Sequence, residues 1–303
     1  MISLLARFAA VLILFCMGGI AAALLIAPLT EGDVVAFTSE RDGNSEIYLL
    51  DVGRGTLRNL TQNPYNDYFS VWSLDGEQIA FVTDRDGGDG EIYRMNADGG
   101  GTRRLTFHNG SDITPAWSPD GTQIAFASVR DYNYDYDLFI MDTDGQNVRF
   151  LVQNVIDDVL PTWSPDGSQI AFVSEGNEIQ VISTSEIGAQ VPQMILSHSS
   201  GIYGLDWSPD GSRLTFALRT NTGFSNLYLL PIATPLENLT QISPLIISST
   251  NDASPRWSPD GKSLIFTSAE NGNEDIYVID LTTLHRRRLT HHPAHDYAPA
   301  WRP

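Results

Sequence analysis

The chain has 303 residues, of which 42% are hydrophobic and 10% aromatic, so it is long enough to bury a sizeable core. Its formal net charge at pH 7 is −19 and its pI is near 4.4, which argues against binding to nucleic acid or to anionic lipid, because both need a basic face. An acidic surface favours cations and basic protein patches as partners, or it serves solubility alone. The single cysteine, Cys16, excludes an internal disulfide.

The first 30 residues form an apolar leader. Residues 8–29 are apolar over a length that suits a membrane-spanning helix better than the shorter apolar core of a signal peptide. Arg7 is the only charge in the leader, and a positive residue before the span sends the downstream chain across the membrane. Ala21-Ala22-Ala23 offers a cleavage site. We therefore expect residues 1–30 to be a membrane anchor or signal peptide. The rest would lie outside the cytoplasm of a bacterium, periplasmic or extracellular, and would be secreted if the leader is cleaved.

After the leader, the sequence repeats itself about every 45 residues. The repeat is marked by six tryptophans: Trp72, Trp117, Trp163, Trp207, Trp257 and Trp301. Four of them open an identical Trp-Ser-Pro-Asp-Gly run, and short β-branched and aromatic runs come after it, separated by Asp-Gly, Asn-Gly and Gly-Gly pairs. Such pairs make tight turns between antiparallel strands. Each repeat therefore predicts four short strands, and a period of this length is typical of a propeller or a solenoid.

The two ends of the repeat array complement each other. Residues 34–48 align with residues 78–93 and supply the later strands of a repeat without its first strand. Residues 298–301 supply a first strand with nothing after it. Joining the C-terminal strand (about 298–301) to the N-terminal strands (about 34–61) removes the exposed sheet edges of an open stack. We expect an all-β, six-bladed β-propeller of four-stranded antiparallel blades over residues 31–303, preceded by one N-terminal hydrophobic helix.

The repeat also resembles a known family. The pattern Pro-x-Trp-Ser-Pro-Asp-Gly-x-x-Ile-Ala-Phe, continued by Thr83-Asp-Arg-Asp-Gly and Glu91-Ile-Tyr93, is similar to the TolB-type propeller repeats, also called PD40 or WD40-like repeats. The resemblance recurs six times over about residues 31–303, and it implies a six-bladed propeller. TolB works in the bacterial cell envelope and binds a lipoprotein through its propeller, so the resemblance implies an envelope protein with a protein partner. The partner itself does not carry over, because this chain has no room for the α/β domain that precedes the TolB propeller.

Aspartates recur five residues before most of the tryptophans. They are Asp67, Asp112, Asp158, Asp252 and Asp296, whereas Ile202 stands at this place before Trp207. In a propeller this position lies at the mouth of the central channel, on the face opposite the entry of the leader. Five carboxylates around one axis predict a site for a divalent cation or for a basic side chain of a partner. The alternative is structural: each aspartate caps a loop or pairs with an arginine such as Arg41, Arg85 or Arg130.

One loop, residues 131–137, is longer than its counterparts. Asp131, Asn133, Asp135 and Asp137 alternate as oxygen ligands do in an EF-hand, so this loop is a candidate calcium site, although Tyr136 stands where that motif needs glycine. Its tyrosines, Tyr132, Tyr134 and Tyr136, alternatively predict a surface for contact with a partner, because tyrosine gives contact area at low entropy cost. A plain solvated loop and a metal site at His291, His292 and His295 are further alternatives.

The sequence favours a monomeric propeller that acts as an interaction module, a scaffold or adaptor of the cell envelope. A rigid ring would present an acidic face with tyrosines to a protein or peptide, with no cofactor and no nucleic acid. The alternative is an enzyme of the lyase, hydrolase or lactonase type with a metal in the axial channel. No Gly-x-Ser-x-Gly nucleophile motif is present in the chain.

Overall fold

The computed structural model describes residues 33–130, 134–185, 191–232 and 243–303, and this part of the chain is built from short β-strands. In chain order they are β1 (Val34–Ser39), β2 (Glu46–Asp51), β3 (Thr56–Asn59), β4 (Asp67–Trp72), β5 (Gln78–Thr83), β6 (Glu91–Asn96), β7 (Arg103–Arg104), β8 (Asp112–Trp117), β9 (Gln123–Ser128), β10 (Asp137–Asp142), β11 (Arg149–Val152), β12 (Asp158–Trp163), β13 (Gln169–Ser174), β14 (Glu178–Ser183), β15 (Gln193–Ser197), β16 (Ile202–Trp207), β17 (Arg213–Arg219), β18 (Ser225–Pro231), β19 (Asp252–Trp257), β20 (Ser263–Ser268), β21 (Asp275–Asp280), β22 (Arg286–Arg288) and β23 (Asp296–Trp301).

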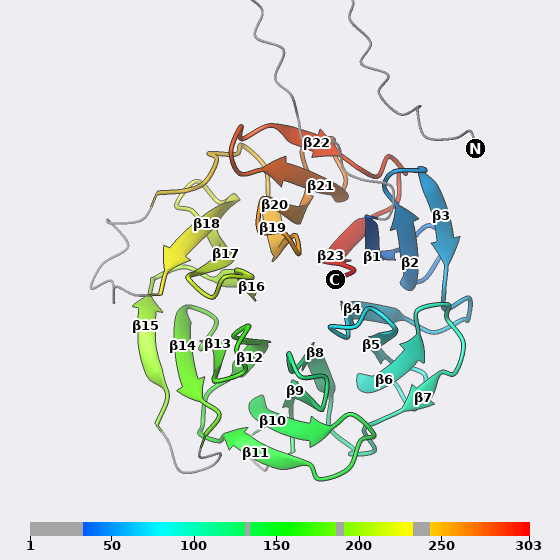
Figure 1. Ribbon diagram of the computed structural model, residues 1–303, viewed down its shortest axis with the longest axis vertical. Helices are drawn as coiled ribbons and strands as arrows, with labels where there is room; N and C mark the ends of the chain where they lie inside the picture. The colour runs from blue at the N-terminus through cyan, green and yellow to red at the C-terminus, as the bar shows by residue number, and fades with distance from the viewer. Residues whose placement is uncertain (1–32, 131–133, 186–190, 233–242) are drawn as a thin grey trace, which may run out of the picture.

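The strands form six antiparallel sheets arranged as blades around one axis, which confirms the predicted six-bladed propeller (Figure 1). Five sheets have four strands, and the described residues give the sixth three strands, β16, β17 and β18. The strand nearest the axis is the one that ends at the repeated tryptophan: β4, β8, β12, β16, β19 or β23. The C-terminal strand β23 pairs with β1, with Val35 opposite Trp301 and Ser39 opposite Asp296.

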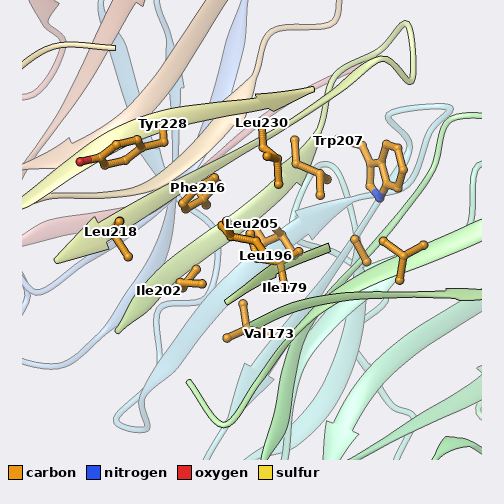
Figure 2. Packing of buried hydrophobic residues seen from close by; sticks show 13 residues of the cluster. Val173, Ile179, Leu196, Ile202, Leu205, Trp207, Phe216, Leu218, Tyr228 and Leu230 are labelled. Carbon is orange, nitrogen blue, oxygen red and sulfur yellow. The ribbon is translucent and has the colours of Figure 1, made fainter. Parts of the chain in front are cut away.

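The core lies between neighbouring blades. The second strand of each blade is buried on both faces, because its blade is packed between two others, and this explains its nearly continuous apolar sequence. Six equivalent phenylalanines are at most 1% exposed: Phe37, Phe81, Phe126, Phe172, Phe216 and Phe266. Figure 2 shows one such cluster, to which Trp207 and Phe216 belong together with Val173 and Ile179 of the preceding blade.

Each innermost strand carries a β-bulge two residues after its first residue. The register against the second strand shifts there in all six blades. The bulged residues have positive φ: Phe69, Thr114, Leu160, Gly204, Ser254 and Ala298. A bulge bends its strand and re-aims the neighbouring side chains. The bulges were not predicted from the sequence, because five of the six positions are not glycine.

The predicted N-terminal helix, residues 1–30, lies outside the described residues. Within the described residues, no helix is long and apolar enough to cross a membrane.

Candidate functional site

The innermost strands all run in the same direction along the axis, so the ring has two chemically different ends. At one end, which we call the Asp end, the innermost strands begin and the loops that connect consecutive blades are found. At the other, the Trp end, the innermost strands finish in tryptophan and continue into the Ser-Pro-Asp-Gly turns. Candidate sites occur at both ends.

The five aspartates that were predicted to bind at the channel mouth are buried inside the blades, each at most 2% exposed. Asp296, for example, accepts a hydrogen bond from Ser39 Oγ at 2.6 Å, and Asp158 accepts one from Ser174 Oγ at 2.5 Å. Four of the five also form ion pairs with arginine: Arg41–Asp296 at 2.9 Å, Arg85–Asp67 at 2.8 Å, Arg130–Asp112 at 3.1 Å and Arg286–Asp252 at 3.1 Å. These contacts are those of the structural alternative, and the binding role of the aspartates stays a prediction.

Besides their ion pairs with aspartate, these arginines contact aromatic rings. The Arg130 guanidinium lies 5.2 Å from the ring centre of Phe126 and 4.8 Å from that of Phe139, and its Nε donates to Ser128 Oγ at 2.7 Å. Burial raises the pKa of the Asp112 carboxyl, and Arg130 opposes that shift. Carboxylate, hydroxyl, guanidinium and two rings thus form one buried unit, which we call the arginine clasp. Arg41 and Arg85 make the same arrangement, and Arg286, which comes from β22, makes a similar one in which Nη2 donates to Ser268 Oγ at 3.0 Å.

The blade from β12 to β15 lacks the clasp. Gly176 stands two residues after Ser174, at the place that Arg130 has after Ser128, and no arginine of the described residues pairs with Asp158. Asp158 is held instead by Ser174 and by Asn154 Nδ2 at 2.6 Å. Burial raises the pKa of Asp158 to about 6, and the nearby carboxylates of Asp135 and Asp157 add to the shift.

The loop at residues 131–137 is described only in part. Asp131, Tyr132 and Asn133 lie outside the described residues. Of the remaining predicted contact and metal residues, Tyr134 is 83% exposed, Tyr136 packs on the core, and Asp135 and Asp137 are buried. In the described part of the chain, no group of three His, Cys, Asp or Glu side chains is placed to hold a metal ion. The predicted calcium site and the predicted contact loop stay predictions.

Most of the strongly exposed apolar side chains lie on loops of the Asp end. Within the described residues, five large hydrophobic side chains are more than 70% exposed. Four of them belong to Asp-end loops: Phe107 at 71%, Tyr134 at 83%, Val155 at 76% and Ile247 at 82%. They come from four different inter-strand connections. Strongly exposed apolar side chains on one face of the ring offer contact area to another molecule.

The Trp end is built from repeated hydrogen-bonded turns. In the turn after Trp163, Ser164 Oγ donates to Asp166 Oδ1 at 2.6 Å and accepts the N–H of Gln169 at 3.0 Å. These bonds recur in the other four turns, and they leave five exposed carboxylates, those of Asp75, Asp120, Asp166, Asp210 and Asp260. Hydrogen bonds from serine hydroxyls and backbone N–H groups lower the pKa of Asp166 and Asp210 to about 2.

A pocket of about 500 Å³ opens between these turns around the axis, and we call it the Trp pocket. All six repeated tryptophans line it, together with prolines of the innermost strands and of the turns. At the level of the bulges the channel narrows to a cavity of about 40 Å³, which Phe69, Leu160 and Gly204 help to line. The sequence signal for this pocket is the Trp-Ser-Pro motif itself, which had been interpreted only as a marker of the fold.

One charged pair lies in the wall of the Trp pocket. The residue before each tryptophan faces the axis, and in two consecutive blades it is Asp206 and Arg256. Their closest atoms, Oδ1 and Nη1, are 3.6 Å apart, and the side chains are 21% and 28% exposed. Asp206 Oδ2 also accepts the Trp257 N–H at 2.8 Å, and Arg256 Nη1 donates to the Leu205 carbonyl at 3.0 Å. Burial raises the pKa of Asp206, and Arg256 and these N–H groups oppose the shift.

Comparisons with known proteins support the fold. In the Tol-Pal system protein TolB of Roseobacter denitrificans, 42 residues are 50% identical to this chain, which is 14% of this chain and 10% of that protein. The crystal structure of TolB from Acinetobacter baumannii superposes with a TM-score of 0.73 at 19% identity, over 90% of this chain and 67% of that one. Oligogalacturonate lyase in complex with manganese gives 0.61 at 18% identity, over 86% and 74%. At these identities the two structures show the fold alone.

The family is shown by the sequence match to PD40, described as the TolB beta propeller domain. The match covers residues 19–134 and 122–244, which is more than half of the chain. Together with the six tryptophan-marked blades, it shows that the chain belongs to the PD40 family of TolB β-propeller domains.

Proposed function

We propose that this chain is a protein interaction module of the bacterial cell envelope, which binds its partner through the loops of the Asp end. The observation that carries the proposal is that four of the five most exposed large apolar side chains of the described residues lie on loops at this end, namely Phe107, Tyr134, Val155 and Ile247. Large apolar side chains at the surface cost solubility, and a surface that buries them on a partner removes that cost. The acidic composition keeps the free protein soluble and favours a partner with basic groups around the contact.

The ring supplies rigidity to this surface. The arginine clasps tie the start of an innermost strand to the end of the second strand, and the connecting loops leave from these points. A surface that is already ordered loses little conformational entropy on binding. The proposed mechanism is therefore rigid presentation, in which the partner meets loops that are already in place.

The location is inferred from the apolar leader and from the relative named as a Tol-Pal system protein. We propose that the propeller works outside the cytoplasm, where the leader would carry it.

Capture of a partner from envelope extract tests this function. The full chain would be compared with a variant that carries Phe107→Ser, Val155→Ser and Ile247→Ser, and with a control that carries Met194→Ser. Met194 is also exposed, at 53%, but it lies on the outer strand β15. We expect one protein to be crosslinked by the wild type and by the control, and at least about tenfold less by the triple variant, since a few apolar contacts carry most of the energy of an interface. Equal capture by all three proteins would contradict the proposal.

A further inference from the structure

We propose that the Trp pocket is a second binding site, at the opposite end of the ring, and that it takes a basic side chain carried on an apolar segment of a partner protein. The proposal does not rest on the function of the Asp end, because the two surfaces share no residue. Its ligand is identified by chemistry: a lysine or arginine flanked by apolar residues.

The size and lining of the pocket suit one side chain with its neighbours. A volume of about 500 Å³ lies in the range of pockets that hold small ligands. Beyond it the channel narrows to a cavity of about 40 Å³ at the bulges, so a segment that enters from the Trp end finishes there. The tryptophans and prolines of the wall offer apolar area that water solvates poorly.

The tryptophans at this end already bind guanidinium groups of the chain itself. Arg302 lies 5.4 Å from the ring centre of Trp72, and Arg213 lies 5.7 Å from that of Trp257. Trp117 and Trp163 are partly exposed in the pocket, and no arginine of the described residues lies over them. A cation over an indole face is attracted by the negative face of the ring, and the attraction grows where water is excluded.

Charge on the turns around the pocket favours the same ligand, since other residues of these turns line the pocket. The five turn carboxylates are exposed, and the hydrogen bonds described above keep them ionised. Lys262, which lies 3.5 Å from Asp260, and the two stacked arginines offset only part of this charge. A surface with excess negative charge attracts basic segments and repels acidic ones.

Inside the pocket, Asp206 supplies the counter-charge. Its distance of 3.6 Å from Arg256 is longer than a hydrogen bond, so its Oδ1 can accept from an incoming guanidinium or ammonium group. Arg256 keeps its bond to the Leu205 carbonyl when this happens. The pair would then become a triad of two cations around one carboxylate.

Peptide binding to the full chain tests the proposal. The probe is acetyl-Leu-Pro-Arg-Pro-Leu-amide, and the matched probes replace arginine with citrulline, which is neutral with a similar shape, or with glutamate. Binding is measured by calorimetry and by the change in tryptophan fluorescence. We expect the arginine peptide to bind at least about tenfold more tightly than the citrulline peptide, because the guanidinium charge gains both the indole faces and Asp206.

Three variants locate the site. Asp206→Asn removes the counter-charge, and we expect it to weaken the arginine peptide about tenfold. Leu74→Arg places a basic side chain at the mouth, from a position that is 57% exposed and lines the pocket, and we expect it to compete with the peptide. Asp89→Asn, an exposed carboxylate on an Asp-end loop, is the control and should leave binding unchanged.

Several outcomes would overturn the proposal: no binding of the arginine peptide, equal binding of the citrulline peptide, or stronger binding of the glutamate peptide, which would make Arg256 an anion site. If Asp206→Asn does not fold, Leu74→Arg alone decides whether the pocket is the site. The triple variant of the Asp end keeps its Trp pocket, so it should bind the arginine peptide like the wild type even if partner capture fails.

Discussion

The two ends of the innermost strands are built from similar residues and differ in what those residues are free to do. At the Asp end, aspartate, serine or threonine, and arginine bind one another inside four of the six blades, and the surface beyond them displays apolar side chains. At the Trp end, aspartate and serine fold a turn by hydrogen bonds, and the carboxylate stays in solvent beside an apolar pocket. Burial, and not the residue type, therefore decides which carboxylates hold the ring together and which can meet a ligand.

The largest expected effect comes from breaking a clasp at the Asp end. Arg130→Met keeps much of the side-chain volume over Phe126 and Phe139 but leaves Asp112 buried without its cation. Losing one partner of a buried ion pair costs about 3–5 kcal/mol of unfolding free energy. Urea denaturation at pH 7 measures it. Arg54→Met, which removes an arginine that is 69% exposed and pairs with Asp51, is the control and should change stability by less than about 1 kcal/mol. Similar losses in both variants would mean that the clasp is not a unit of stability.

In the blade from β12 to β15, which has the aspartate but no arginine, we expect the loss of the carboxylate charge to stabilise the protein. The pKa of Asp158 in the folded protein is about 6, above its ordinary value of 3.8, so the folded state holds this proton more tightly than the unfolded chain. The stability from that group is fully present below pH 3.8 and is lost as the pH rises through about 6. At pH 8 the buried charge costs about 3 kcal/mol.

Asp158→Asn removes this cost, and we expect it to stabilise the protein by up to about 3 kcal/mol at pH 8 and by little at pH 4. Thermal unfolding across this pH range measures the difference between variant and wild type. Asn keeps one oxygen to accept from the Asn154 amide, and the Ser174 hydroxyl, which now donates to the other carboxylate oxygen, can turn to accept from the new NH2 group. A stability difference that does not depend on pH would show that Asp158 does not titrate near pH 6 in the folded protein.

A smaller effect on stability is expected at the bulges, which lie between the two ends of the innermost strands. Gly204 is the one glycine among the six bulged positions, and a Cβ there would lie 2.7 Å from Ser254 Cα of the next blade. Because Phe69 and Thr114 adopt similar φ angles, the conformation itself is tolerated by other residues, and the clash explains the glycine. We expect Gly204→Ala to cost about 1–3 kcal/mol in urea denaturation. Gly223→Ala, at φ +91 with open space around it, measures the effect of conformation alone. If both cost the same, the close approach of the blades is not what requires glycine.

The fold could be predicted from the sequence because the same residues recur in every repeat. Six tryptophans and the Asp-Gly turns predict the blades, and the described strands match that prediction. The candidate sites were harder to predict. A repeated aspartate looks the same in sequence whether it lines a channel or binds Arg130, since the arginine lies 18 residues away along the chain. The Trp pocket was not predicted for a related reason. A tryptophan that recurs in every repeat is typical of the core, and here the same tryptophans also line the pocket at the axis. Only Asp206 and Arg256, which break the pattern of small or apolar residues before tryptophan, could have drawn attention to it.

The smallest effect is expected at a turn of the Trp end. Ser164→Ala removes the hydroxyl that donates to Asp166 and accepts the Gln169 N–H, and the net loss of such bonds is about 1 kcal/mol. The same change should raise the pKa of Asp166 from about 2 toward its ordinary value of 3.8, because the Ser164 hydroxyl is the largest cause of the lowering. Carboxyl resonances followed by NMR give the pKa of Asp166 directly. A titration from about pH 1.5 to about pH 6 spans both the lowered pKa and the ordinary one. An unchanged pKa of Asp166 would show that the backbone N–H and the hydroxyl of Ser168 are enough to hold the charge. The negative mouth of the Trp pocket would then depend on the shape of the turn and not on its serine.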